Sequence, residues 1–302
     1  DHPILIYSRR DLNGMLLRRA QQAGARIEQT RVLGMDRTER GWSLRTKSGV
    51  AEADYCVVAT GARNPLRNAG TELTPADSMS ALGYFVPGQR TQIDLQFLPE
   101  LDGYIWVFPR RGHMSVGICG KGQTAAGMRV RLERYMADHG LVKDGATYYG
   151  HLLPSLETAS WKRNRVAGDG WLAVGDAAGL VDPITGEGIY YAIRSGDLAA
   201  QSILTEPADP ASAYRRLVRR DFVEDLEFAS QIAHRFFNGS FLLGPITSRM
   251  VQFTRRSPRF RGVMQDLFAG TQPYIGLKHR LIAGFHRSLV EIGFSFFSGA
   301  GC

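Results

Sequence analysis

The chain has 302 residues, of which 44% are hydrophobic and 22% are charged. This length can bury the core of one large or two ordinary domains, and the composition excludes a disordered chain. No apolar run approaches the roughly 20 residues of a membrane-spanning helix. The three cysteines, Cys56, Cys119 and Cys302, are too widely spaced for a disulfide framework or a metal site. A reducing, cytoplasmic setting is therefore the simpler expectation.

The net charge of +8 is concentrated in the last third of the chain. Residues 1–210 hold 24 lysines and arginines against 23 acidic residues, whereas residues 211–302 hold 13 against 6. A basic, apolar region of this kind favours peripheral contact with the inner face of an anionic membrane, or an acidic partner. No nucleic-acid partner is expected, because no DNA- or RNA-binding motif accompanies the charge.

The first predicted element is a helix over Tyr7–Ala23, where apolar residues recur at spacings of three and four. Ser8 or Asp11 is available as its N-terminal cap. Three strands are predicted next, at 26–30, 42–46 and 54–59. The last of these is apolar throughout, as expected of a parallel strand buried on both faces, and it ends in a turn that contains Gly61.

From residue 91 the pattern changes to short runs divided by turn residues. Strands at 91–97, 104–108 and 114–119 predict an antiparallel sheet. Strand alternation places Tyr104, Trp106 and Phe108 on one face of the middle strand. Three aromatic side chains in a row favour a long apolar slot, which suits an isoprenoid chain better than a small polar acid. An amphipathic helix is predicted to follow over 124–139.

The most informative stretch is 170–193, which predicts a strand, a tight turn and a helix start. The apolar run ends at Gly175, and a loop with several glycines and one proline leads to helical apolar spacing from Ile189. Glycines let a backbone lie close against a ligand. Asp176, at the end of the strand, can accept hydrogen bonds from a sugar hydroxyl. The helix start favours an anionic or electron-accepting ligand.

The remaining chain predicts amphipathic helices at 214–234, 241–253, 259–268 and 279–297. The last carries Phe294, Phe296 and Phe297 beside basic residues. Such a helix can lie in a bilayer interface or pack as a cap on a substrate cavity, and the sequence favours neither.

The string from Gly175 to Ile189 resembles the second flavin motif of the p-hydroxybenzoate-hydroxylase-like FAD oxidoreductases, in the form found in geranylgeranyl reductases. The resemblance implies that Asp176 holds the ribityl or ribose hydroxyls of FAD and that the helix start faces the flavin ring. The loop positions that it assigns to the cofactor are Gly175, Pro183, Gly186, Gly188 and Ile189. Tyr104–Pro109 is similar to the Tyr-x-Trp-x-Phe-Pro element of these reductases, so its three aromatic residues are candidate substrate contacts.

Two weaker likenesses add to the expected cofactor site. Arg9 lies in a segment similar to the family's Arg-x-x-Phe-Asp-x-x-Leu, whose arginine reaches the adenosine side of FAD, although Leu12 and Asn13 replace the Phe and the Asp. The turn at 59–62 resembles the family's Ala-Thr-Gly-Ala turn and makes Gly61 a cofactor candidate. Thr60 stands where the hydroxylases have an aspartate, which weakens any claim to their handling of pyridine nucleotides.

The family's Gly-x-Gly-x-x-Gly segment is not found before Arg9. We therefore expect an α/β fold whose glutathione-reductase-like, Rossmann-like FAD domain (1–80 and 160–208) is incomplete at its N-terminal end. An antiparallel-sheet substrate domain (81–159) and a helical C-terminal region (209–302) complete the expectation. The parallel sheet should show a free, apolar edge, and the isolated chain should bind FAD weakly.

The leading hypothesis is an FAD-dependent enzyme that reduces C=C bonds of an isoprenoid lipid or quinone chain, with NAD(P)H as a candidate reductant. Three alternatives stay open: a flavin monooxygenase or halogenase, an electron-transferring membrane quinone reductase, and a membrane-associated binding protein without catalysis. No residue stands out as the proton donor. Tyr104 is the only polar group on the aromatic strand, and neither it nor His151 is assigned a catalytic role.

Overall fold

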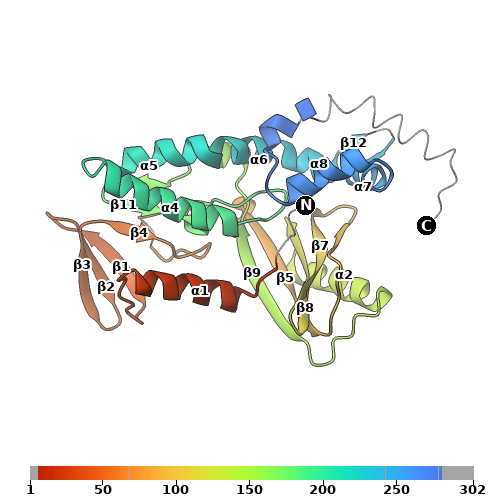
Figure 1. Cartoon of the computed structure of the whole chain (residues 1–302), viewed down its shortest axis with the longest axis horizontal. Helices are drawn as coiled ribbons and strands as arrows, with labels where there is room; N and C mark the ends of the chain where they lie inside the picture. Colours follow the sequence, from red (N-terminus) through yellow and green to blue (C-terminus); the bar gives the residue numbers. More distant parts are fainter. Residues whose placement is uncertain (1–5, 67, 242, 278, 281–302) are drawn as a thin grey trace.

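The computed structural model describes residues 6–66, 68–241, 243–277, 279 and 280 (Figure 1). The predicted helix over 279–297, with its three phenylalanines, lies outside these residues, as does Cys302. The helices and strands come in this order: α1 (Arg9–Gln22), β1 (Val32–Arg37), β2 (Trp42–Thr46), β3 (Gly49–Ala53), β4 (Cys56–Val58), β5 (Ser78–Pro87), β6 (Asp94–Phe97), β7 (Asp102–Arg110), β8 (His113–Lys121), α2 (Ala125–Asp138), β9 (Thr147–Pro154), α3 (Thr158–Trp161), β10 (Ala167–Gly168), β11 (Trp171–Ala173), α4 (Ile189–Thr205), α5 (Pro210–Val218), α6 (Glu224–Asn238), β12 (Ser240–Phe241), β13 (Gly244–Pro245), α7 (Ile246–Arg256) and α8 (Pro258–Phe268).

The largest sheet is antiparallel and has the strand order β6-β7-β8-β5-β9. One of its faces carries buried apolar residues such as Val107, Val116 and Ile118, and these pack with Met128 and Leu132 of α2. The predicted inward face of α2 is therefore confirmed. The opposite face carries Tyr104, Trp106 and Phe108, as strand alternation predicted. The sheet thus has a sealed side and an aromatic side.

The two strands predicted to lead into the turns at Gly61 and Gly175 are β4 and β11. They pair in parallel, Cys56 with Trp171 and Val58 with Ala173, in the order β10-β11-β4. Within the described residues β4 has no neighbour on its other side, and Val57 of this strand is 48% exposed. A free, apolar edge was predicted for the parallel sheet, and β4 is an edge strand among the described residues.

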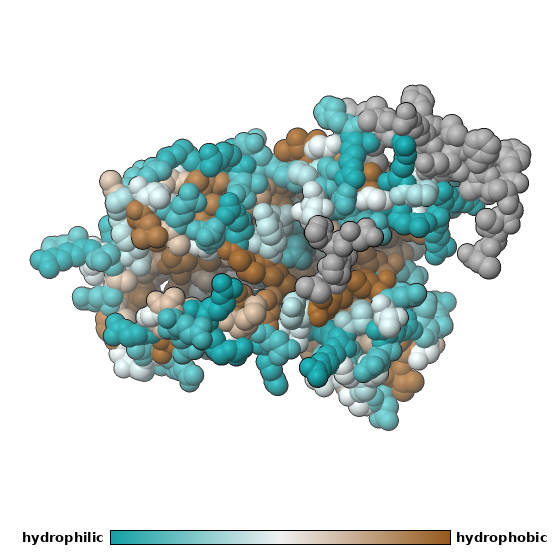
Figure 2. Space-filling view, viewed as in Figure 1, coloured by the Kyte–Doolittle hydropathy of each residue, from teal (hydrophilic) through white to brown (hydrophobic). Residues whose placement is uncertain are grey.

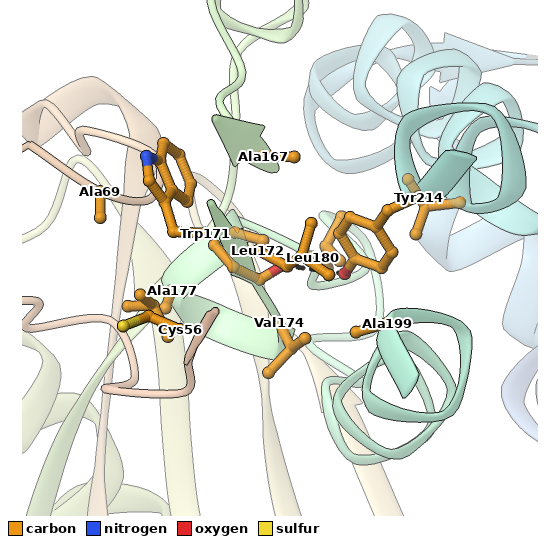
Figure 3. Close-up of a cluster of buried hydrophobic side chains, with 14 of the residues drawn as sticks. Cys56, Ala69, Ala167, Trp171, Leu172, Val174, Ala177, Leu180, Ala199 and Tyr214 are labelled. Carbon is orange, nitrogen blue, oxygen red and sulfur yellow. Dashed lines mark hydrogen bonds between the residues drawn. The ribbon is translucent and has the colours of Figure 1, made fainter. Parts of the chain in front are cut away.

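A buried cluster supports the end of β11 (Figure 3). Figure 3 shows the ring of Tyr214 pointing from α5 toward Leu180, with Ala199 of α4 on the neighbouring side. The Tyr214 hydroxyl donates a hydrogen bond of 2.8 Å to the carbonyl oxygen of Ala173. Because this hydroxyl is buried, its bond fixes the last residue of the strand before the cofactor turn.

The C-terminal helices α6, α7 and α8 form a third cluster, which includes Phe237, Met264 and Leu267. Ile184, from the loop before α4, and Tyr274, which follows α8, are buried in the same cluster. The helical region therefore packs against the predicted cofactor loop. Among the helices that the structure describes, none combines the length and apolar character needed to cross a bilayer.

The strand prediction was wrong at residues 26–30, and it missed β3, β5, β9 and the short strands β10, β12 and β13. Residues 26–30 form no strand: Ile27 is the only apolar residue of this run, and no strand in the described chain lies beside it to complete the hydrogen bonds. β1 begins later, at Val32. β5 and β9 were not predicted, yet β5 lies between β8 and β9 and is a central strand of the large sheet.

The middle of the molecule is hollowed. Figure 2 shows hydrophobic surface gathered around this hollow, which lies between the α4 side and the α1 side in the view of Figure 1. Both helices expose large apolar side chains, among them Tyr190 and Ile193 of α4 and Met15 and Leu17 of α1. Exposed apolar side chains gathered in a depression are typical of a ligand-binding site.

Candidate functional site

The turn after β11 requires a glycine. Gly175 has φ +54°, and a Cβ at this position would lie 2.9 Å from the Cβ of Ala192 in α4. Its backbone N–H donates a hydrogen bond of 2.9 Å to Ser195 Oγ, one turn further along α4. The turn is therefore held tightly against the helix that follows the loop.

Asp176 comes directly after this turn, and its carboxylate lies beside the start of α4. Asp176 Oδ1 is 3.4 Å from the position that a Cβ would take at Gly188, the residue before α4 begins. Partial burial raises the pKa of Asp176, and the positive charge of Arg9 opposes this rise. Among the described residues, no other side chain donates a hydrogen bond to this carboxylate. Within the described chain this carboxylate is an acceptor without a side-chain donor, which fits the hydroxyl groups of a sugar.

The loop from 182 to 188 is organised by a second, buried aspartate that the sequence did not single out. Asp182 Oδ1 accepts hydrogen bonds from the backbone N–H groups of Ile184, at 2.8 Å, and Thr185, at 3.0 Å. The hydroxyl of Tyr274 donates to Asp182 Oδ2 at 2.9 Å. Asp182 is 6% exposed, and burial raises its pKa. These three donors fix the shape of the loop that holds Pro183, Gly186 and Gly188.

Tyr274 is itself held by the C-terminal helices. Its backbone N–H and that of Ile275 donate to the two carboxylate oxygens of Asp225 in α6, at 3.0 and 2.9 Å. A contact between residues 92 positions apart leaves no local pattern, so it could not be predicted from the sequence. The only available signal was that an aspartate follows a buried run and precedes a proline.

The predicted substrate strand reaches the same loop from the other side. The Tyr104 hydroxyl donates a hydrogen bond to the carbonyl oxygen of Thr185, and the side chain of Tyr104 is 9% exposed. Gly186, with φ +71°, lies beside this hydroxyl. Tyr104 therefore ties the aromatic face of the sheet to the cofactor loop and is largely covered there.

The aromatic side chains next to Tyr104 lie flat on the sheet. A Cβ at Gly117 would overlap the ring of Trp106, and a Cβ at Gly83 would lie 2.6 Å from the Tyr149 hydroxyl. Ser115 Oγ lies 2.8 Å from that hydroxyl and accepts a hydrogen bond of 3.3 Å from Trp106 Nε1. Glycines in neighbouring strands therefore make room for a broad aromatic surface whose polar atoms are paired with one another.

Phe108 continues this surface, with its ring stacked on Trp106 at 6.2 Å between centroids. Phe108 lies four residues beyond Tyr104, about 13 Å along the strand. The structure thus brings the three predicted substrate residues onto one face but separates Phe108 from the loop. His151 is exposed on the same face, 5.8 Å from the Tyr149 ring.

The remaining predicted cofactor residues surround this loop less closely. Arg9 is exposed at the first position of α1, whose N-terminal cap is Ser8. Gly61, with φ +79°, follows β4. Because β4 and β11 are parallel, Gly61 and Gly175 lie at the same end of the sheet, where ligands bind in open α/β folds. Ile189 begins α4 and is 38% exposed.

Comparison with known proteins agrees with this geometry. Residues 8–204 match the FAD dependent oxidoreductase family. Digeranylgeranylglycerophospholipid reductase 2 of Methanothermobacter thermautotrophicus is 30% identical over 247 residues, which cover 74% of this chain and 62% of that protein. Menaquinone reductase of Mycolicibacterium smegmatis is 28% identical over 251 residues, covering 79% of this chain and 54% of that protein. The chain thus spans less than two thirds of the length of these curated relatives.

A solved structure gives the same fold. The geranylgeranyl bacteriochlorophyll reductase-like protein of Thermoplasma acidophilum superposes with a TM-score of 0.62, at 22% identity, over 86% of this chain and 75% of that one. At this identity the likeness supports the architecture alone. It agrees with the predicted α/β flavoprotein fold with an antiparallel sheet and a helical C-terminal region.

Proposed function

The chain belongs to the FAD-dependent oxidoreductase family, and from this premise we propose that it is part of an enzyme that reduces C=C bonds of an isoprenoid lipid or quinone chain. The observation that carries the proposal is the aromatic face of the large sheet. This face begins at the cofactor loop, where Tyr104 bonds Thr185, and continues through Trp106 to Phe108. A continuous aromatic surface beside a flavin suits a long apolar chain.

The assignment of FAD to this site rests on the groups around the loop that are free to bind a ligand. Asp176 would accept hydrogen bonds from sugar hydroxyls of FAD, and Arg9 would neutralise part of its anionic portion. The loop with Pro183, Gly186 and Gly188 would lie against the flavin ring, next to the positive end of α4. When bound and reduced, FAD supplies the hydride; the residues of this chain orient the ring and the substrate and exclude water from the aromatic face.

The substrate half draws on two relatives whose names point to different lipids. One is named for a phospholipid with geranylgeranyl chains and the other for a quinone. Both would suit the apolar surface at Trp106 and Phe108, so the surface alone does not separate them. NAD(P)H is the proposed reductant, and the roles given to the site residues are part of the proposal.

The decisive test is turnover by the full-length, flavin-loaded protein. Reduced flavin, supplied chemically, should convert a geranylgeranyl lipid or menaquinone into a product heavier by two hydrogens per reduced bond, as detected by mass spectrometry. Trp106→Ala should raise KM for these substrates while FAD binding is retained. No gain of hydrogen with either substrate would sink the proposal. A gain of oxygen or halogen under air would favour the monooxygenase or halogenase alternative instead.

Peripheral membrane contact through the C-terminal region is a second part of the proposal. The β12–β13 hairpin exposes Phe241 and Leu243, and residues 239–265 contain five arginines and no acidic residue. Exposed apolar side chains beside basic ones can enter an anionic bilayer interface. Flotation with vesicles of phosphatidylserine and phosphatidylcholine should carry the protein upward, and Leu243→Asp should reduce this fraction at least about threefold. Equal flotation of the variant would contradict the assignment.

A further inference from the structure

The far end of the aromatic face, away from the cofactor loop, carries an arginine that nothing above assigns. Arg110 is the last residue of β7 and follows Tyr104, Trp106 and Phe108 on the same face. It lies six residues from Tyr104, about 20 Å along the strand. A long apolar ligand that lies along this face from the loop would therefore end beside a guanidinium group.

The surroundings of Arg110 are aromatic, and no acidic side chain among the described residues forms a hydrogen bond or ion pair with it. Its guanidinium carbon lies 5.7 Å from the centre of the Phe85 ring. Phe85 is stacked on Tyr149 at 4.5 Å and meets the ring of His113 edge-on at 5.5 Å. Arg110 Nε is buried and has no hydrogen-bond partner in the described part of the chain. A half-buried cation with an unpaired donor is costly unless an anion binds it.

A second arginine, Arg9, lies close enough to Arg110 to affect it electrostatically. The pKa of Arg110 is lowered mainly by burial, and the nearby charge of Arg9 lowers it further. Arg9 also interacts with Asp176 across the hollow. Neither arginine forms an ion pair among the residues that the structure describes. The one acidic residue at the start of α1, Asp11, accepts its hydrogen bond from Ser8. The two guanidinium groups are therefore close enough to repel each other, and neither is neutralised by an ion pair in the described chain.

We propose that Arg110, together with Arg9, forms a binding site for a phosphate or diphosphate group at the end of the aromatic face. A guanidinium group presents two parallel N–H donors to phosphate oxygens, and the aromatic wall lowers the competition from water. The phosphate has two sources, the head group of an isoprenoid substrate or the diphosphate of FAD. The first source rests on the proposed function and would make an anionic lipid a better substrate than menaquinone.

The test measures binding rather than turnover. Inorganic pyrophosphate is titrated into the full-length apoprotein, and an anionic digeranylgeranyl phospholipid and menaquinone are titrated into the full-length, flavin-loaded protein, all followed by tryptophan fluorescence. FAD is titrated separately into the apoprotein. Arg110→Gln should weaken pyrophosphate binding by at least about tenfold, as expected for the loss of a charge-assisted pair. Arg110→Lys should recover part of the lost affinity, because the lysine ammonium keeps the positive charge but lacks the two parallel N–H donors of the guanidinium group.

The two sources and the failure of the inference have different outcomes. If the phosphate belongs to the substrate, Arg110→Gln weakens phospholipid binding and leaves menaquinone and FAD binding unchanged. If it belongs to the cofactor, FAD binding weakens instead. Arg111→Gln is the matched control, because this exposed neighbour carries the same charge in the turn after β7. Retained affinity for all three phosphate compounds in Arg110→Gln, or an equal loss in Arg111→Gln, would overturn the inference.

Two further measurements keep the result interpretable. Arg9→Gln changes an exposed residue, so it should fold as the parent does and weaken the same phosphate compound by a smaller factor, about threefold. If Arg110→Gln folded poorly, parental affinity for all phosphate compounds in Arg9→Gln would refute the shared site. Arg110-dependent phosphate binding without any reduction of lipid would sink the proposed function but not this site.

Discussion

The two regions that were predicted to hold FAD are built in opposite ways. The connection from Gly175 to Gly188 is largely buried. Ser195, Tyr104 and Tyr274 each form a hydrogen bond with it, and each comes from a different part of the fold. Helix α1, which carries Arg9, has no buried residue. The difference teaches that the fold preforms the part of the site proposed to hold the sugar and the flavin ring. The part of the proposed site at Arg9 lies on an exposed helix, so the position of this side chain depends on the ligand that binds there.

The strongest way to break this comparison is to fill the preformed turn. Gly175→Val adds a side chain at φ +54°, within 2.9 Å of Ala192 Cβ and 3.2 Å of its Cα. Left-handed strain and overpacking together should lower the free energy of unfolding by about 3 kcal/mol or more. Chemical denaturation measures this, and FAD titration should show that binding is lost.

The matched control for the turn is Gly196→Ala in α4. No atom lies within 4 Å of the position that its Cβ would take, and the residue is helical. This change should leave FAD binding intact and raise stability by about 0.5 kcal/mol, because alanine favours the helix. A similar, small effect of both substitutions would show that the turn is not as tightly held as the geometry indicates.

The next largest effect should come from the contact between the C-terminal region and the loop. Tyr274→Phe removes one of three donors to buried Asp182, which should cost about 1–3 kcal/mol of stability and weaken FAD binding. Tyr84→Phe is the control. The Tyr84 hydroxyl donates to Glu133, and in the variant this carboxylate still has its ion pairs with Arg129 and Lys143. The loss of stability should therefore stay below about 1 kcal/mol.

The effect of Tyr274→Phe should depend on pH in a defined direction. Burial raises the pKa of Asp182 in the folded protein, and the tyrosine hydroxyl opposes that rise. An acid with a raised folded pKa contributes more stability below its unfolded pKa, and that contribution falls as pH rises through the folded pKa. The variant should therefore be most destabilised near neutral pH, and the difference should shrink on acidification. A difference that is constant with pH would show that Tyr274 acts through packing alone.

The same contrast explains what the sequence could predict. The strand, turn and helix of 170–193 are specified by local features, namely an apolar run, glycines at positive φ and a helix start, and they were predicted correctly. The alternation on β7 and the inward face of α2 were equally local. β5 was missed because both of its faces are largely apolar: Leu82, Tyr84 and Val86 point to α2, and Met79, Ala81 and Phe85 lie on the other face, so no period-two pattern emerges.

What the sequence could not predict is chiefly contact between distant segments. The bond from Tyr274 to Asp182 and the placement of Arg110 against Phe85 depend on how the sheet and the C-terminal helices pack, and neither has a local signature. The strand predicted at 26–30 was wrong because this run has only one apolar residue to bury, Ile27, and no neighbouring strand in the described chain completes its hydrogen bonds. The domain boundaries at 80, 160 and 208 stay predictions, although the large sheet itself spans Ser78–Pro154.

The smallest expected effect lies at the exposed end of the site and sharpens the comparison most. Arg9→Gln should weaken FAD binding by only about twofold to fivefold, because an exposed charge is screened by solvent. Arg10→Gln, one residue along the same helix and equally exposed, should have no effect on binding. Because Arg9 opposes the raised pKa of Asp176, its removal should raise that pKa further.

The pH profile of FAD binding then separates a specific role of Arg9 from a general one. The ionised carboxylate of Asp176 is the form that accepts hydroxyl groups, so affinity should fall as pH drops through its raised pKa. Titrations between about pH 4 and about pH 7.5 should place this fall at higher pH in Arg9→Gln than in the parent or in Arg10→Gln. An equal loss of affinity at every pH, with no shift in the pH of the fall, would mean that Arg9 contacts FAD directly and does not act through the pKa of Asp176. A profile like the parent's in every respect would remove Arg9 from the site.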